Sequence, residues 1–172
     1  VAAAGFINKV PEIVKEYGNE FTVATVGTIK VTPHSVNVIP GTCTFSLEIR
    51  DQSAEVMKLI ENHLRQLLED ICKKYGVTST FVPTSYHDPA PMSELVRGTI
   101  EEAVKELGID YTVIPSGAFH DSLIMTSVFP TGMIFVPSKD GISHSRYEYT
   151  APEDIENGCN VLLNTVLKLD EK

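Results

Sequence analysis

Apolar side chains recur every three or four residues in four stretches, which predicts four helices. These stretches cover 1–17, 54–75, about 93–107 and the segment that follows Thr150. The clearest stripe lies in 54–75 and consists of Val56, Leu59, Ile60, His63, Leu64, Leu67, Leu68, Ile71, Cys72 and Tyr75. Glycines follow three of the stretches and are expected to end them. Pro11 lies inside the first stretch and is expected to kink or split that helix.

Strand-forming patterns lie between the first two helices. Residues 21–31 are rich in Thr and Val, and apolar and polar residues alternate along 42–50, as in a half-buried strand. The Pro- and Gly-containing segment between these two predicts a turn. Residues 77–86 predict a further strand, which Pro83 would place at a sheet edge. The first part of the chain is therefore an α+β arrangement, a small antiparallel sheet covered on one face by two helices.

Helices and strands alternate in the second part, as in an α/β layer. Short strands are expected at Tyr111–Ile114 and in the wholly apolar segment 132–136, with loops at 115–122 and 137–149. Thr150 and Glu153 form a capping box, and the apolar face of the last helix should be Ile155, Cys159, Leu162, Leu163, Val166 and Leu169. Two short parallel strands cannot bury both faces of a sheet, so partner strands must come from another chain or from missing sequence. The expected division is 1–88 and 89–172.

Composition narrows the functional classes. The 172 residues carry 14 Lys and Arg against 23 Asp and Glu, a net charge of −9 with no basic run, which argues against a nucleic-acid partner. No stretch approaches the roughly 18 apolar residues that span a membrane. Three distant cysteines without a CxxC motif favour reduced thiols and a cytoplasmic protein. The chain has no initiator Met, so we expect it to have been trimmed.

Two histidines are the main candidates for chemistry, because each lies in a polar loop after an expected strand, where α/β proteins bind ligands. They are His120, followed by Asp121, and His144, with Glu148 four residues later. Either carboxylate could orient the neighbouring imidazole. One histidine alone does not make a zinc site, which needs at least three protein ligands. The other histidines are assigned structural or solvated roles: His34, His63 and His87.

Two further residues could hold a substrate. Asn37 lies in the turn before 42–50, and Arg50 ends that strand on its polar face. An amide and a guanidinium could bind a substrate amide and a carboxylate, although a turn residue and a surface arginine are the simpler interpretation. The GISHS segment resembles a serine nucleophile elbow but lacks the final Gly and the strand before it. No cysteine is placed for catalysis.

Three segments, taken in order, resemble the M20-type metallohydrolases: VGTIKVTPHSVNVIPGTCTFSLEIRD, SGAFHD and GMIFVPSKDGISHSRYEYTAPED. Within that group the chain is most similar to the amidase, hydantoinase/carbamoylase family, which includes N-carbamoyl-L-amino-acid hydrolases and allantoate amidohydrolases. The resemblance implies that 1–88 is a lid, or dimerisation, domain without its first strand. It implies that 89–172 is the C-terminal segment of a catalytic α/β domain.

The resemblance also implies roles for single residues. His144 matches a metal ligand of a site with two divalent ions, zinc or manganese. His120 matches a catalytic histidine that binds substrate and stabilises the oxyanion, with Asp121 and Glu148 behind the two imidazoles. Asn37 and Arg50 match substrate-binding residues of the lid, Arg50 through the substrate carboxylate. Phe119 and Arg146 depart from the family pattern, which usually has Gly and Pro there.

The remaining metal ligands and the glutamate base of the family lie upstream of the matched region. We therefore expect a C-terminal fragment that is inactive by itself and retains no metal. The whole protein is expected to be a homodimer that hydrolyses a linear C–N bond in a small substrate with a carboxylate. The alternatives are a noncatalytic dimerisation module and an M20-type peptidase or deacylase.

Overall fold

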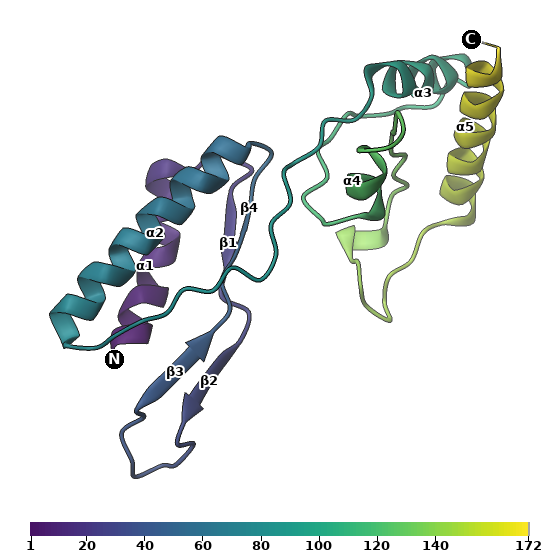
Figure 1. The fold of residues 1–172 in the computed structure, drawn as a ribbon. Coiled ribbons are helices and arrows are strands. Elements are labelled where there is room, and N and C mark those ends of the chain that lie inside the picture. Colours follow the sequence, from purple (N-terminus) through teal and green to yellow (C-terminus); the bar gives the residue numbers. More distant parts are fainter. Residues whose placement is uncertain (172) are drawn as a thin grey trace. The chain divides into compact units, whose positions relative to one another are not determined.

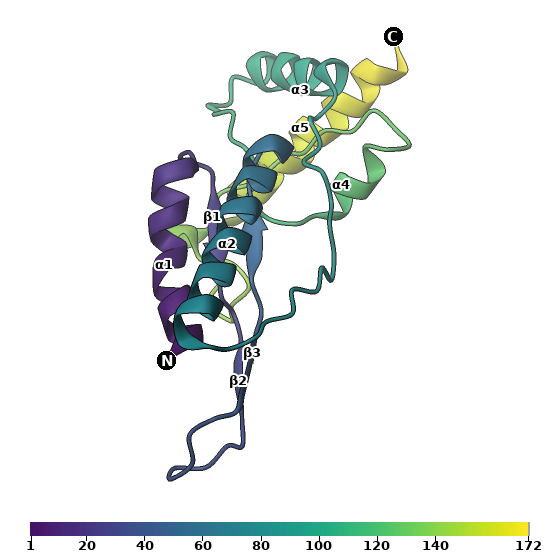
Figure 2. The same cartoon turned by 60° about the vertical axis from the view of Figure 1, so that its left-hand side comes forward.

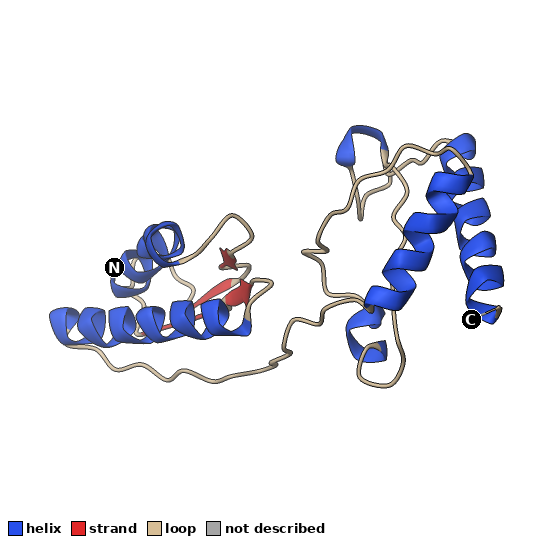
Figure 3. Ribbon diagram, turned by 90° about the horizontal axis from the view of Figure 1, so that it is seen from above, coloured by secondary structure: helices blue, strands red, loops and turns tan. Residues whose placement is uncertain are grey.

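The computed structural model describes residues 1–171 and divides the chain into two compact units, Val1–Pro89 and Ala90 onward (Figure 1). The expected boundary, between residues 88 and 89, lies one residue earlier. The first unit combines two helices with paired antiparallel strands, as the sequence predicts. The second unit contains helices and extended segments but no strand among its described residues, as the colouring by secondary structure shows (Figure 3).

Two long helices form one layer of the first unit. Helix α1 spans Ala2–Tyr17 and α2 spans Ala54–Tyr75, so both predicted helices are confirmed. The Ser53 hydroxyl caps α2 by accepting the Val56 N–H, and Gly76 ends it with a left-handed conformation, φ 63°. The two helices pack against each other, and each also contacts one strand of the sheet layer, as Figures 1 and 2 show.

The strands form a hairpin whose two arms are each interrupted once. β1 (Val23–Thr25) pairs with β4 (Glu48–Arg50), and β2 (Ile29–Thr32) pairs with β3 (Thr42–Phe45), both antiparallel. Between the two ladders, residues 26–28 on one arm lie opposite only 46–47 on the other. The first arm therefore carries one extra residue, which is a β-bulge. Because of this bulge, the apolar positions of the two ladders lie on the same face of the hairpin.

Apolar side chains from both layers make the core of the first unit. The most buried members come from the helices: Phe6, Val10, Ile60, Leu64 and Ile71. The sheet contributes its inward positions on both arms, Ala24, Phe45, Leu47 and Ile49. The rings of Phe6 and Phe45 lie 5.4 Å apart, centroid to centroid. The alternating pattern of 42–50 therefore predicts the inward face of that arm correctly.

Two expectations for the first unit are wrong, a split of the first helix at Pro11 and a strand at 77–86, whereas Gly18 ends α1 as expected. α1 continues through Pro11, which lies on its exposed side, where water can bind the carbonyl left without a partner. Gly18 follows α1 in an extended conformation, φ −91°, and is required for another reason: a Cβ there would lie 2.6 Å from the Val14 carbonyl oxygen. Residues 77–86 are not a strand, because no strand among the described residues pairs with them.

The second unit is built on α3 (Glu94–Glu106) and α5 (Pro152–Asp170), which pack against each other. Between them lie the short α4 (Asp121–Met125) and the 3-10 turn η1 (Lys139–Gly141). The strands expected at 111–114 and 132–136 do not form, since neither segment finds a ladder partner among the described residues. The capping box is also wrong, because Ala151 is the N-cap of α5 and makes no side-chain cap bond.

The face that α5 buries differs from the predicted one. Val161 and Thr165 are buried against α3, where Thr99, Ala103 and Val104 are their buried counterparts. Most of the predicted apolar face of α5 is exposed, and only its last member is half-buried: Ile155, Cys159, Leu162, Leu163, Val166 and Leu169. On α3, the apolar side chains of Leu95 and Leu107 are also exposed. Periodicity predicts which side of a helix is apolar, but it does not predict which other element packs against that side.

Truncation of the first core should be costly. Leu64 on α2 is fully buried, whereas Leu59 on the same helix is 42% exposed. Leu64→Ala is expected to lower the free energy of unfolding by about 2–5 kcal/mol, because it leaves a cavity. Leu59→Ala removes the same atoms from a largely solvated site and should cost about 1 kcal/mol or less. Urea denaturation followed by circular dichroism measures both, and equal losses would contradict the assigned core.

Candidate active-site segments

The loop that carries His144 is closed by its own backbone. The Lys139 N–H donates to the Tyr149 carbonyl over 2.8 Å and so joins the two ends of the loop. Inside it, the Ser138 hydroxyl donates to the Ile142 carbonyl over 2.5 Å, and η1 makes the first turn. A loop with its ends tied in this way can hold an exposed side chain in a defined place without burying it.

His144 has a left-handed backbone, with φ 57°, and is exposed. Its N–H donates to Glu148 Oε2 over 2.7 Å, while the Ser143 hydroxyl lies 3.0 Å from its Nδ1. Glu148 therefore contacts the backbone of His144, whereas the sequence suggested a contact with the imidazole. A left-handed non-glycine residue costs about 1–3 kcal/mol. A hydrogen bond contributes about 0.5–1.5 kcal/mol, and about 1.5–3 kcal/mol when one partner is charged, so this contact offsets part or all of that cost.

His120 is the N-cap of α4. Its Nδ1 accepts the Ser122 N–H over 3.1 Å, and the Ser122 hydroxyl lies at the same distance. Because a backbone N–H can only donate, Nδ1 carries no proton in this geometry, and the neutral ring carries its proton on Nε2. Asp121 follows as the first residue of α4, and among the described residues Ser122, not Asp121, holds the imidazole.

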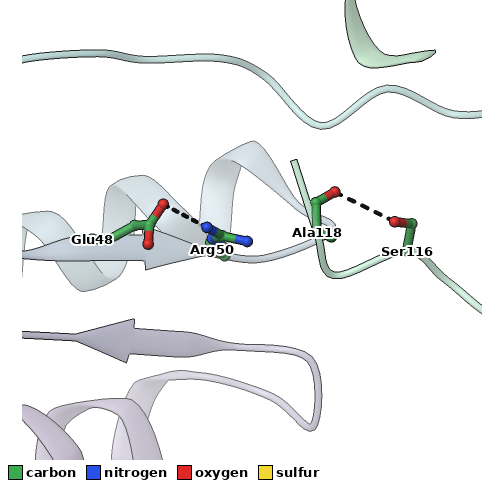
Figure 4. A network of polar contacts seen from close by, with 4 residues as sticks. All are labelled: Glu48, Arg50, Ser116 and Ala118. Atoms are coloured by element: carbon green, nitrogen blue, oxygen red, sulfur yellow. Dashed lines mark hydrogen bonds and ion pairs between the residues drawn. The ribbon is translucent and has the colours of Figure 1, made fainter. Parts of the chain in front are cut away.

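Arg50 and Asn37 are placed by the hairpin. Arg50 ends β4, and its Nη2 donates to Glu48 Oε1 over 2.8 Å (Figure 4). Both side chains stay partly exposed, 42% for Arg50 and 60% for Glu48, so this pair is weakly stabilising at most. Asn37 lies in the exposed connection between β2 and β3, where its Oδ1 accepts the Ser35 hydroxyl over 2.8 Å.

The hairpin keeps Asn37 and Arg50 apart. Asn37 precedes Thr42, the first residue of β3, and Arg50 is the last residue of β4 on the same arm. Arg50 lies eight positions after Thr42, which at about 3.3 Å per residue is at most roughly 26 Å of extended chain. Asn37 and Arg50 therefore lie toward opposite ends of the hairpin, a separation that the sequence pattern does not give.

Serine hydroxyls are the contacts that sequence reasoning missed. Ser122 lies against His120, and Ser143 lies against His144. The loop before His120 holds another, because the Ser116 hydroxyl donates to the Ala118 carbonyl over 3.3 Å (Figure 4). The available signal was a serine within two residues of each histidine, since short hydroxyl side chains bond to nearby groups in turns.

Other features of the described chain set limits on its chemistry. His63 stacks on Tyr17 with ring centroids 3.6 Å apart and planes at 14°, which confirms its structural role. The three cysteines are free. Within residues 1–171 no three His, Cys, Asp or Glu side chains are grouped as a metal site would require, and no helix is long and apolar enough to span a membrane.

Comparison with known proteins identifies relatives over nearly the whole chain. An N-carbamoyl-L-amino acid amidohydrolase of Geobacillus stearothermophilus is 39% identical over 168 residues, which are 98% of this chain and 41% of that protein. An allantoate amidohydrolase of Bacillus subtilis is 34% identical over 145 residues, 84% of this chain and 35% of that protein. The chain thus spans about two fifths of the length of these curated relatives.

Solved structures and a family model agree with these relatives. The crystal structure of an amidase of the hydantoinase/carbamoylase family from Burkholderia multivorans superimposes with a TM-score of 0.86 at 34% identity, covering 97% of this chain and 40% of that one. The model of peptidase family M20/M25/M40 matches residues 7–168. The chain therefore belongs to the M20/M25/M40 family, and the two curated relatives named above are both amidohydrolases.

Proposed function

We propose that this chain is the C-terminal part of a longer amidohydrolase that cleaves a linear C–N bond in an N-carbamoyl amino acid or a ureido acid. The main support is the 39% identity to an N-carbamoyl-L-amino acid amidohydrolase over 98% of the chain. Residues 1–88 would be the lid, or dimerisation, domain of a homodimeric cytoplasmic enzyme. Residues 89–172 would belong to its catalytic domain, where further strands would pair with 111–114 and 132–136.

His120 would bind substrate and stabilise the oxyanion. Its Nδ1 is occupied by the Ser122 N–H, so its Nε2–H is the group left to donate. A donor aimed at the oxygen that becomes negative lowers the barrier of acyl-type transfer, because the interaction strengthens as charge develops. Asp121 has no assigned part in this step beyond its place in the first turn of α4.

Arg50 would bind the substrate carboxylate, and Asn37 would bind another polar group of the substrate. The guanidinium of Arg50 already bonds to a carboxylate, that of Glu48, at its partly exposed position. A planar fork of N–H groups suits a carboxylate better than a point charge does. Substrate would therefore compete with, or join, Glu48 at this guanidinium.

The family resemblance implies two divalent ions, zinc or manganese, but the residues of this chain do not fit such a site by themselves. His144 is the one side chain assigned to it, and the described residues hold no group of three possible ligands. A zinc site needs three or more protein ligands. We infer that the other ligands belong to sequence outside this chain, and we assign no catalytic step to a metal here.

A peptidase or deacylase is the second candidate, and the name of the matched family favours it. Such enzymes would cleave a C–N bond in a peptide or acylated amine rather than in a carbamoyl group. A noncatalytic dimerisation module remains the alternative for the first unit taken alone. Parallel assays of the longer protein on an N-carbamoyl amino acid, allantoate, a dipeptide and an N-acyl amino acid separate the enzymatic candidates.

The chain alone should be inactive. Incubation of the 172-residue chain with zinc or manganese and an N-carbamoyl amino acid is expected to release no ammonia, because the metal ligands are too few. The longer protein, assayed under the same conditions, is the positive control. Measurable turnover by the 172-residue chain would contradict its assignment as an incomplete enzyme.

Arg50→Ala in the longer protein should raise KM for carboxylate substrates on the order of tenfold or more, since a hydrogen-bonded ion contact is lost. Arg50→Lys should fall in between, because lysine keeps the charge but not the fork. Arg97→Ala on α3 removes an exposed arginine elsewhere and serves as the control. Steady-state kinetics measure all three, and an unchanged KM in Arg50→Ala would remove the role given to Arg50.

The tautomer of His120 can be tested directly. Long-range 1H–15N spectra of the neutral imidazole should show a protonated Nε2 and an unprotonated Nδ1. Ser122→Pro removes the N–H donor and should weaken this preference, while Ser122→Ala keeps the N–H and should preserve it. A protonated Nδ1 in the chain without substitutions would contradict the N-cap geometry and would rule out Nε2–H as the donor.

A further inference from the structure

We propose that Glu148 is the positioning residue of His144, and that it acts through the main-chain N–H of that histidine and not through the imidazole. The relevance of this contact to catalysis rests on the proposed function. The positioning role is argued from two features of the loop. One is the left-handed backbone of His144, and the other is the bond from its N–H to the Glu148 carboxylate.

A tight turn brings the carboxylate back to the histidine. The Glu148 N–H donates to the Ser145 carbonyl over 3.0 Å, and the Tyr147 N–H donates to the Ser145 hydroxyl over 3.3 Å. The chain therefore reverses between 145 and 148, which returns the Glu148 side chain to the start of the turn. The carboxylate oxygen then lies 2.7 Å from the His144 nitrogen, a short distance typical of a charge-assisted bond.

The backbone conformation determines where the imidazole can point. At a left-handed φ, the Cα–Cβ bond leaves the chain in a different direction from that of an extended or helical residue. Without the carboxylate, His144 would relax to a negative φ, and its side chain would leave the loop in another direction. Glu148 therefore sets the direction of the imidazole while making no contact with the ring.

The ring is held by a different group. Ser143, the preceding residue, places its hydroxyl 3.0 Å from Nδ1. Two side chains therefore hold His144: Glu148 binds its backbone N–H, and Ser143 contacts its imidazole. A carboxylate that only accepts an N–H bond can be replaced by the carbonyl oxygen of glutamine, whereas a carboxylate needed for its charge on the ring cannot.

The direct test is amide hydrogen exchange at residue 144 in the 172-residue chain. Glu148→Ala should speed the exchange of the His144 N–H roughly tenfold, because its acceptor is lost. Glu148→Gln should keep the slow exchange, since the amide oxygen accepts the same bond. Glu148→Asp keeps the charge but shortens the side chain by one carbon, and should behave like alanine. Glu156→Ala on α5 makes the same charge change outside the loop and should leave the exchange unchanged.

The outcomes separate the two proposals. Unchanged exchange in Glu148→Ala, or fast exchange in Glu148→Gln, would overturn the positioning role whatever the activity. In the longer protein, Glu148→Ala should lower kcat/KM and Glu148→Gln should restore it. Loss of activity in both variants would also overturn the positioning role, because it would make the charge itself essential. If exchange behaves as expected but the longer parent hydrolyses no C–N bond, the proposed function fails and the positioning role stands.

Discussion

Hydrogen bonding between the two arms of the 23–50 hairpin is the constraint on which the first unit depends. The arms satisfy each other's backbone groups and so present one apolar face, against which α1 and α2 pack. Extended segments of similar composition at 77–86, 111–114 and 132–136 have no such partner among the described residues and form no strand. A segment forms a strand only when a second segment pairs with its backbone, so the pattern of one segment alone does not determine a strand.

Helices could be predicted from the sequence more completely than strands for this reason. The bonds of a helix are internal, so the stripe of 54–75 with Ser53 before it and Gly76 after it defines α2 without reference to any other segment. The buried face of α5 could not be predicted, because it depends on the packing of α5 against α3. The buried residues are Val161 and Thr165 on α5 and Thr99, Ala103 and Val104 on α3. Small and polar residues at that contact carry little signal in a hydrophobic pattern.

For the site residues, the sequence predicted the local element of each one but not its distance from the others or its partners. The sequence placed His120 and His144 in loops and Arg50 at a strand end, and the structure agrees with those locations. It could not predict that Asn37 lies at the far end of the hairpin from Arg50, because spacing along a chain does not measure distance in an extended arm. Nor could it assign the partner of Glu148, since a residue four positions away can reach either a backbone N–H or a ring.

The bulge divides the hairpin into a ladder that packs on the helices, β1–β4, and a ladder that extends away from the bulge, β2–β3. Thr28 and Ser46 bridge it, with the Ser46 hydroxyl accepting the Thr28 N–H over 3.0 Å and the Ser46 N–H donating to the Thr28 carbonyl over 3.1 Å. On one side of it β1 and β4 contact α1 and α2. On the other side β2 and β3 lead to the loop that joins them, as Figure 2 shows, and Asn37 lies in that loop. Phe45, at the inner end of the β2–β3 ladder, still packs on Phe6. Only the part of the hairpin beyond Phe45 can therefore change in length or direction without disturbing the core.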